Sequence, residues 1–575
     1  MQNENKRQNY TGADALNDAL INAGTDCVFF NSGTDYPPII ESWAKAEEQG
    51  RDTPRVIICP HEIPALGAAQ GYAQITGKAQ AVFVHVDVGT QNLGGILHNA
   101  FRCRVPVFIF SGLSPFSIEG ELRGGRNAYI QFVQDVKDQG GIVRQYTKMN
   151  YEYRSAKNIQ QLTYRALQIA HSEPMGPVYM MATREVLEDE AINISADVSR
   201  WGAVSPSGLD GESIKILTRA LAEAKKPLII TSYSGRNVRC PAELEKLAES
   251  YAIPVVEMNH SRMNFPNGNP LHVGFDTHGF IEYADVALII DCDVPWIPSV
   301  TGPKPNCRVF YLDTDPLKED MSVWYIRAER YMRADSLTAI RQLNEETEKI
   351  TEFLNKKMIE TRRARIHDIH KRQREEWAAA GDEKDFITPE FLTKCVNEIA
   401  NDDTVVLSEN ITNRTVSDQL MPRNVPGTYF TNGGGGLGWN GGAAVGMKLA
   451  CPDKDVIALT GDGTYIFTCP TAVFWMAAKY KTPFLTVIYN NQGWNAPKKF
   501  TAGQHPDGYA VRSGKFYSSL ALDPPARLDL IAQAAGGAFA KTVSDPGELR
   551  QALAEGMEAV RGGTAAVINV MLPQI

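Results

Sequence analysis

The chain has 575 residues, of which 43% are hydrophobic and 22% charged, and its formal net charge is −9 at pH 7. This length predicts three or four domains rather than one core. The negative charge argues against nucleic acid or an anionic membrane as the main partner. No run of roughly eighteen apolar residues is present that could span a bilayer.

The start of the chain and its cysteines both indicate a cytoplasmic protein. The first residues, MQNENKRQNYTG, are polar and lack the apolar segment of a secretory signal. The cysteines are scattered and form no CxxC pair, which is typical of reduced thiols rather than of a disulfide framework or a zinc site.

The first region, residues 1–195, alternates short apolar runs with helical patterns, which is typical of a parallel sheet with crossover helices. Helices are predicted at 11–23 and over the small-residue stretch 62–76, and strands at 26–30, 55–59, 81–86, 105–112 and 176–182. The sequence SPSGLDGE (205–212) then predicts a linker.

Two further regions, 205–345 and 386–575, have the same alternating texture. Their predicted strands lie at 226–231, 254–258, 285–291, 308–315, 403–408, 455–461, 483–491 and 565–572. Between the two regions, residues 346–385 are crowded with Lys, Arg and Glu at helical spacing, which indicates a solvated linker helix. The sequence therefore predicts an α/β protein with three doubly wound parallel-sheet domains.

The glycine-rich segment NGGGGLGWNGG (432–442) contains a formal GxGxxG at 433–438. This motif predicts a dinucleotide site when it follows a strand and opens a helix. The preceding stretch, PRNVPGTYFTN, is broken by proline and only briefly strand-like, which weakens the evidence for a dinucleotide site. A nicotinamide-dependent oxidoreductase, using NAD(P), nevertheless stays open as an alternative function.

A second group of polar residues follows two neighbouring strands of the third region. The strand DVIALT runs into Gly-Asp-Gly at 461–463, and the strand FLTVIY ends in Asn-Asn at 490–491, with 26 residues between, enough for one helix and one strand. The carboxyl ends of parallel strands lie at one edge of the sheet, where α/β proteins bind ligands. We therefore expect these groups to lie close together.

The expected site suits Mg²⁺ holding a diphosphate, because this ion takes a few protein oxygens together with phosphate and water. The predicted ligands are a carboxylate, an amide oxygen and a backbone carbonyl: Asp462, Asn491 and Gly493. Gly461 and Gly463 would let the backbone approach the phosphates closely. On its own, either the Gly-Asp-Gly segment or the Asn-Asn segment is more often an ordinary turn at the end of a strand.

The spacing of GDG and NN resembles the signature of thiamine-diphosphate-dependent enzymes, most of all the acetolactate synthase and benzoylformate decarboxylase branch. The resemblance gives Asp462, Asn491 and Gly493 the Mg²⁺-binding role. The spacing is slightly longer than is common, so an extra turn or bulge is expected after Gly463. PHEIPALGAAQGYAQITGK (60–78) is similar to the family segment that carries the activating glutamate, here Glu62. Without the resemblance, a glutamate at a helix start is explained by the helix dipole.

The same resemblance implies further contacts with the cofactor. Leu437 would be the bulky apolar residue that bends it, and the Gly435 carbonyl would accept a hydrogen bond from its amino group. Other residues that would contact it are Asn92, Asn410, Thr412 and Thr464.

On the substrate side the resemblance is to benzoylformate decarboxylase. NSGTDYP (31–37) places Thr34 at an active-site serine, and FVHVDVGTQN (83–92) places His85 at a catalytic histidine. His85 could equally be a hydrogen-bonded histidine at the end of a strand. Gln131 resembles a glutamine near the substrate of acetolactate synthases. The decarboxylase's second histidine has no counterpart, since DCDVPWIPS (291–299) places Trp296 or Pro298 there.

The resemblance thus implies a lyase or carboligase that acts on a 2-oxo acid or a 2-hydroxy ketone with thiamine diphosphate and Mg²⁺. It also implies a homodimer or homotetramer in which Glu62 and the cation site of one active centre come from two chains. FAD is not expected, because KPLIITSYSGRN and VGFDTHGF do not reproduce the glycine-rich turns of acetolactate synthases.

Two more functions stay open but are disfavoured. A 2-hydroxyacyl-CoA lyase is disfavoured because the last predicted strand ends within three residues of the final one, which leaves no C-terminal lid. A non-catalytic paralogue is disfavoured by the presence of Asp462, Asn491 and Glu62.

Overall fold

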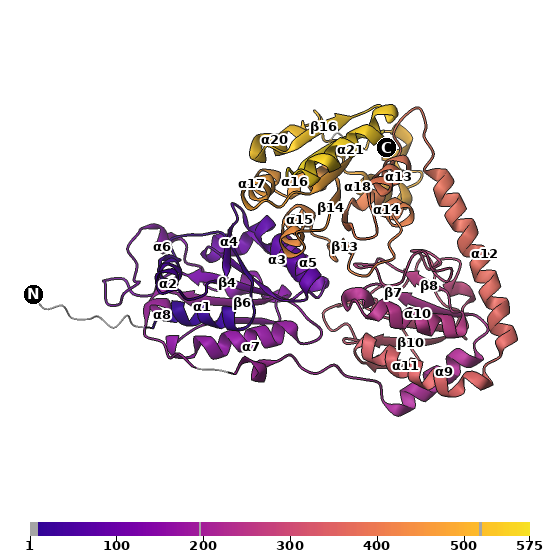
Figure 1. Ribbon diagram of the computed structural model, residues 1–575, viewed down its shortest axis with the longest axis horizontal. Helices are drawn as coiled ribbons and strands as arrows, with labels where there is room; N and C mark the ends of the chain where they lie inside the picture. The colour runs from indigo at the N-terminus through magenta and orange to yellow at the C-terminus, as the bar shows by residue number, and fades with distance from the viewer. Residues whose placement is uncertain (1–9, 195–196, 517–519, 575) are drawn as a thin grey trace, which may run out of the picture.

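The computed structural model describes residues 10–194, 197–516 and 520–574, and Figure 1 shows three α/β units along the chain. Each unit is built on one sheet, and the named strand pairs within each sheet are parallel. The predicted fold class is therefore confirmed. The polar stretch 1–9 lies outside the described residues. Within the described ranges, no helix combines the length and the apolar character that crossing a bilayer requires.

The first unit has a six-stranded sheet of order β2-β1-β3-β4-β6-β5. The strands are β1 (Cys27–Phe30), β2 (Arg55–Ile58), β3 (Gln80–Val84), β4 (Val107–Leu113), β5 (Met149–Glu152) and β6 (Val178–Thr183). The helices are α1 (Gly12–Asn22), α2 (Pro37–Glu48), α3 (Glu62–Thr76), α4 (Val86–Asn92), α5 (Gly94–Arg102), α6 (Ile130–Val133), α7 (Ile159–His171) and α8 (Arg184–Glu188). The edge strand β5 was not predicted because its sequence, MNYE, has no apolar run.

The middle unit has a five-stranded sheet of order β11-β10-β9-β7-β8. Its strands are β7 (Pro227–Thr231), β8 (Val255–Glu257), β9 (Val286–Ile290), β10 (Arg308–Asp313) and β11 (Arg330–Arg333), and its helices are α9 (Gly211–Glu223), α10 (Cys240–Tyr251) and α11 (Ser336–Ile350). The predicted linker 205–212 is wrong at its end, where Asp210 caps α9. The long helix α12 (Lys356–Ala380) then runs along the middle unit towards the third (Figure 1).

The third unit has a six-stranded sheet of order β13-β12-β14-β15-β17-β16. Its strands are β12 (Val405–Glu409), β13 (Tyr429–Thr431), β14 (Val456–Gly461), β15 (Leu485–Asn490), β16 (Phe539–Val543) and β17 (Ala566–Met571). Its helices are α13 (Pro389–Ile399), α14 (Arg414–Leu420), α15 (Trp439–Ala450), α16 (Asp462–Phe467), α17 (Pro470–Tyr480), α18 (Asn495–Gln504), α19 (Tyr509–Ser513), α20 (Leu528–Gly536) and α21 (Pro546–Arg561). When strands are numbered within each sheet, the first and third sheets have the same order, 2-1-3-4-6-5.

The segment between Asp462 and Asn491 differs from the single predicted helix. It forms two helices, α16 and α17, followed by β15. The break comes at Cys469, which has a left-handed φ of 54°, and at Pro470, which opens α17.

The first and third units meet along α3 and α15, which lie side by side (Figure 1). The contact is close because small residues face each other. A Cβ atom added to Gly446 would lie 1.9 Å from the Ala68 carbonyl oxygen, and one added to Gly71 would lie 2.4 Å from that of Ala443. The small-residue stretch 62–76 is therefore a helix-packing surface that allows backbones to approach.

Candidate active site

The predicted cation ligands converge at the carboxyl ends of β14 and β15. The Gly493 backbone N–H donates to Asp462 Oδ2 at 3.0 Å and to Asn491 Oδ1 at 3.3 Å, so both side-chain oxygens point to one place. Burial raises the pKa of the Asp462 carboxyl, and the groups that oppose this shift are backbone N–H groups. Within the described residues, no cluster of three or more His, Cys, Asp or Glu could hold a metal ion, so this site would rely on amide and carbonyl oxygens.

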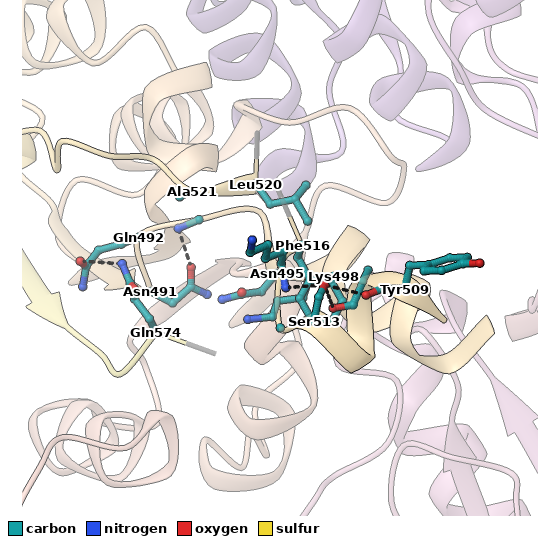
Figure 2. A pocket seen from close by; sticks show the side chains of 14 residues that line it. Asn491, Gln492, Asn495, Lys498, Tyr509, Ser513, Phe516, Leu520, Ala521 and Gln574 are labelled. Carbon is teal, nitrogen blue, oxygen red and sulfur yellow. Dashed lines mark hydrogen bonds between the residues drawn. The ribbon is translucent and has the colours of Figure 1, made fainter. Parts of the chain in front are cut away.

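Segment 520–522 packs across residues 492–494. Trp494 N donates to the Leu520 carbonyl at 2.7 Å, and Leu522 N donates to the Gln492 carbonyl at 2.9 Å. A Cβ atom added at Gly493 would lie 2.6 Å from the Leu520 carbonyl oxygen. The packing of segment 520–522 therefore requires glycine at position 493, whether or not its carbonyl binds a metal ion. The cavity in Figure 2, about 560 Å³, borders Asn491 and Gly493 and is also lined by α18, α19 and residues 514–516.

The two glycines of the GDG sequence have different surroundings. A Cβ at Gly463 would lie 2.6 Å from the Trp494 ring, so the absent side chain makes room for an indole rather than for a phosphate. A Cβ at Gly461 would meet only Thr464 Oγ1, at 3.8 Å. Of the two, Gly461 is therefore the one that leaves open space.

The other predicted cofactor contacts border the same edge of the third sheet. The Asn410 side chain is buried and bonds to the hydroxyl groups of Ser408 and Ser417, at 2.9 and 2.5 Å. Thr464 is buried, Thr412 and Leu437 are half-buried, and Gly435 is exposed. Gly435 also has space around it, since its nearest neighbour for an added Cβ is His98 Nε2 at 3.9 Å.

Glu409 was missed by the sequence analysis and bears on the possibility of a dinucleotide site. Its buried carboxylate accepts hydrogen bonds from the backbone N–H groups of Gly438, Trp439 and Asn440, at 3.1, 3.3 and 2.9 Å. These are the N–H groups at the start of α15 that would bind a pyrophosphate in a nucleotide site. A short strand, β13, precedes the glycines, in line with the briefly strand-like stretch of the sequence, but a protein carboxylate already occupies the helix N-terminus.

Glu62 lies at the start of α3, with only 6% of its surface exposed. Asn92, at the end of α4, donates its amide to Glu62 Oε2 at 3.0 Å. A Cβ at Gly89 would lie 3.1 Å from Glu62 Oε1, so this glycine leaves room for the carboxylate. Asn92 therefore orients Glu62. The sequence predicted a contact between Asn92 and the cofactor, and it did not predict this contact with Glu62.

His85 lies between two groups that the sequence analysis did not select. Its Nδ1 is 2.5 Å from Asp35 Oδ1, and its Nε2 is 2.8 Å from Gln134 Nε2. Burial lowers the pKa of the imidazole, but the hydrogen bond and charge of Asp35 outweigh it, so the pKa is raised overall. The imidazole lies against Gly33, where a Cβ would come within 1.9 Å of Nδ1. Val86, which follows, has φ of 28°, a strained value for a β-branched residue.

Thr34 and Gln131 lie in the same two segments as the partners of His85, but each makes its hydrogen bonds elsewhere. Thr34 is exposed, and its carbonyl accepts a hydrogen bond from Arg184 at 3.3 Å. Gln131 is buried, and its amide bonds within its own loop, to Asn127 and to the backbone N–H of Ala128.

The glutamine that contacts His85 is Gln134, three residues after the predicted one. Both missed partners, Asp35 and Gln134, lie within the strings NSGTDYP and YIQFVQD. Local sequence does not show which member of such a string turns inward, so the partners of His85 were not predicted.

The three units of the chain are similar to those of known proteins. Models of thiamine pyrophosphate enzymes match in three places: the N-terminal TPP binding domain over residues 10–140, the central domain over 214–316 and the C-terminal TPP binding domain over 411–570. The acetolactate synthase large subunit of Corynebacterium glutamicum is 24% identical over 477 residues, which cover 80% of this chain and 71% of that protein. Benzoylformate decarboxylase of Pseudomonas aeruginosa is 24% identical over 491 residues, covering 83% and 85%.

A solved structure has the same fold along nearly the whole length. It is the thiamine diphosphate-dependent 4-hydroxybenzoylformate decarboxylase of Rhodococcus jostii RHA1, with a TM-score of 0.77 and 21% identity, covering 98% of this chain and 99% of that one. The three matched domains follow one another in the order in which the three sheets occur. The chain therefore belongs to the thiamine pyrophosphate enzyme family and is a thiamine-diphosphate-dependent enzyme of the acetolactate synthase and benzoylformate decarboxylase type.

Proposed function

We propose that this enzyme is a Mg²⁺-dependent lyase or carboligase that acts on a 2-oxo acid or a 2-hydroxy ketone in the cytoplasm. The observation that carries the proposal is the convergence of the Asp462 and Asn491 oxygens on one backbone N–H at the carboxyl ends of adjacent strands. When bound, thiamine diphosphate supplies the carbanion chemistry that makes or breaks a carbon–carbon bond beside a carbonyl.

The donor set fits Mg²⁺ and a diphosphate. Asp462 is a buried carboxylate whose pKa is raised, and a divalent cation beside it would stabilise its charged form. Asn491 and the Gly493 carbonyl would add oxygen ligands, and phosphate and water would complete the coordination. Gly461, Asn410, Thr412 and Thr464 border the same edge and would hold the diphosphate.

Glu62 has the features required of an activating carboxyl group. It is buried, oriented by Asn92 and placed beside Gly89, so it can hold a proton against a ring nitrogen of the aminopyrimidine. His85, with its raised pKa, is a candidate for moving a proton near the substrate carbonyl, and Asp35 and Gln134 would fix its orientation. Leu437 and Gly435 would hold the bent cofactor, and Thr34 would lie beside the substrate.

A second copy of the chain would complete the site. Large apolar side chains are exposed on the segment 116–136, including Tyr129 at 80% and Val133 at 71%. Others flank the two chemical centres: Val88 lies beside Gly89, and Phe467 lies on the helix that begins with Asp462. Exposed apolar surface of this extent marks an interface. We propose a homodimer, or a homotetramer built from it, in which Glu62 acts on the cofactor bound by the partner.

The middle unit supports the proposal that FAD is not used. The carboxyl ends of β9 and β10 carry Asp291 and Asp313, which are buried and form ion pairs with Arg236, Arg104 and Lys318. This edge of an α/β sheet is where a nucleotide would bind. Here ion pairs within the chain occupy the ends of β9 and β10, and a smaller cavity of about 360 Å³ borders Arg104 and Lys318. Trp296, which with Pro298 is one of the two candidates for the position of the decarboxylase histidine, is packed into the core of the same unit.

The sharpest test mixes two inactive variants. Glu62→Gln should bind thiamine diphosphate but lose turnover, and Asp462→Ala should lose cofactor binding, measured by calorimetry with Mg²⁺. After the two are unfolded and refolded together, mixed dimers contain one intact site, so activity should return to about a quarter of wild type for random pairing. If the two residues acted within one chain, the mixture would stay inactive, and the shared-site proposal would fail.

The substrate is tested by supplying pyruvate, benzoylformate, acetoin and aromatic aldehydes to the wild-type enzyme with cofactor and Mg²⁺. Product masses distinguish decarboxylation, ligation and cleavage. A 2-hydroxyacyl-CoA substrate should give no product. Turnover that requires a CoA thioester would contradict the proposed substrate class.

A further inference from the structure

A second large cavity lies far from the cofactor edges, between α12 and the middle sheet. Its volume is about 710 Å³, and it borders the residues that precede or begin β7 and β8. This is the amino-terminal edge of the middle sheet, opposite to the edge that carries Asp291 and Asp313. A volume of this size is typical of small-molecule sites.

The wall of this cavity is mainly apolar. Its lining includes Leu228 at the start of the sheet, Phe280 and Tyr283 before β9, and Ile366 and Ile369 on α12. Tyr283 is 57% exposed, so the cavity opens to solvent on that side. Such a wall favours the apolar body of a ligand, since burying apolar surface is stabilising in proportion to its area.

The charged side chains that line the cavity are all basic, while Asp285, just outside the lining, is close enough for its charge to act on Arg362. Among the described residues, its lining includes Lys225, Lys226, Lys357, Arg362 and Arg365 and contains no acidic residue. The surrounding chain has a net charge of −9, so this basic lining departs from the average. Asp285 is outside the lining and accepts hydrogen bonds from the backbone N–H groups of Lys225 and Lys226, at 2.7 and 2.9 Å.

Arg362 is the residue that points to an anionic ligand. It is only 8% exposed, and its Nη1 donates to the Ala224 carbonyl at 3.1 Å. Its Nε and Nη2 atoms have no hydrogen-bond partner among the described residues. Buried donors without acceptors are costly, and for a guanidinium the cost is greater than for a neutral group. Both atoms lie below the surface of the cavity wall, so the guanidinium has to turn outward before a carboxylate can accept the two parallel N–H bonds that Nε and Nη2 can donate.

We propose that this cavity binds an amphipathic organic anion, with its acidic head group on Arg362 and its apolar body against the α12 and β7 wall. Lys226 and Lys357 at the rim would add attraction for the head group. The site is separate from the cofactor site and involves none of its residues. Because α12 continues to the third unit, a ligand here would hold that helix against the middle unit.

The test uses the full-length enzyme saturated with thiamine diphosphate and Mg²⁺, with dodecanoate as the probe in calorimetry. We expect one molecule per chain, and binding of dodecan-1-ol that is weaker by about tenfold or more, since a charged hydrogen-bonded head group contributes roughly that factor. Dodecyl phosphate is compared to distinguish a carboxylate from a phosphate ester. Tighter binding of either anion identifies the source of the head group and supports the proposal.

Two variants locate the site, and one serves as a control. Arg362→Gln should weaken dodecanoate binding by about tenfold or more. Thr361→Trp, at an exposed position on the rim, should block the cavity without disturbing the core. Arg372→Gln, exposed on the same helix, should bind as wild type. The proposal is overturned if the wild type binds neither dodecanoate nor dodecyl phosphate, or if both cavity variants bind these anions as the wild type does. A change in oligomeric state with Thr361→Trp would likewise overturn it and assign the surface to a contact between chains.

Discussion

The first and third units have the same strand order but carry different chemistry at equivalent places. The loop after the third strand holds His85 in the first unit and Asp462 in the third. The loop after the second strand leads to Glu62 in the first unit and to the glycine-rich segment 432–438 in the third. In both units the helix after that loop, α3 or α15, packs against its counterpart. A shared topology therefore determines where the functional groups lie, and the side chains determine what they do.

The two units differ in how these groups are held. In the third unit, Asp462 and Asn491 are joined through the backbone of Gly493, close to them in the chain. In the first unit, His85 depends on Asp35, 50 residues earlier, and on Gln134, 49 residues later. The proposed cofactor side is thus built from adjacent strand ends, whereas the proposed substrate side depends on contacts between distant loops.

The largest effect is expected for Asp462→Ala, which removes the charged ligand from the third unit. The affinity for thiamine diphosphate in the presence of Mg²⁺ should fall by about a hundredfold or more, since the loss of a buried charge partner costs about 2–5 kcal/mol. Calorimetry measures this affinity, and Asp453→Ala, at an exposed position near β14, is the control. Unchanged affinity would mean that the two strand ends do not form the cation site.

Asp35→Asn tests the corresponding position in the first unit. Turnover should fall by about a hundredfold, because a general acid–base group loses the partner that orients it. The Asp35 charge raises the pKa of His85, so the stability from this pair is present at low pH and lost as pH rises through the raised pKa.

The difference in melting temperature between wild type and Asp35→Asn should therefore be larger at about pH 6 than at about pH 9. Cofactor affinity should not change in this variant. A loss of cofactor binding comparable to that of Asp462→Ala would remove the distinction between the two units.

Glu409→Gln tests the helix N-terminus behind the glycine-rich segment. The amide can replace only one carboxylate oxygen, so one backbone N–H of α15 loses its acceptor, at a cost of about 1–3 kcal/mol in the free energy of unfolding. Burial raises the pKa of Glu409 to about 7. The stability that the protonated carboxyl provides is therefore lost as pH rises from the unfolded pKa towards the folded one.

Melting curves between about pH 5 and pH 8 should show the wild type losing stability relative to Glu409→Gln across this range. Glu376→Gln, exposed on α12, should follow the wild type. Parallel curves for wild type and Glu409→Gln would show that Glu409 does not titrate in this range.

The smallest effect separates two glutamines of one loop. Gln134→Ala should lower turnover by about fivefold to tenfold, the effect of losing one hydrogen bond of about 1 kcal/mol to His85. Gln131→Ala should leave the pH profile of turnover unchanged, because its amide bonds within residues 127–131. A shift of the pH profile by Gln131→Ala and not by Gln134→Ala would reverse their roles.

The contrast between the units also explains what the sequence could predict. The fold class, α3 and the strands leading to Asp462 and Asn491 were predicted because each is a local pattern of apolar runs, glycines and polar strand ends. The partners of His85 were not, since nothing in a loop's own sequence shows which side chain it turns towards a distant histidine. Glu409 was missed for a similar reason: its role appears only when β12 is placed beside the start of α15.

The closely packed helices α3 and α15 have a consequence for how the enzyme can vary. Glu62 begins one of these helices, and the distance between the helices is set by positions such as Gly71 and Gly446, where only a hydrogen atom fits. A single methyl group at either position would move a whole domain, and with it the carboxyl group at the helix end. The position of Glu62 relative to the third unit of its own chain is thus set by residues outside the proposed active site.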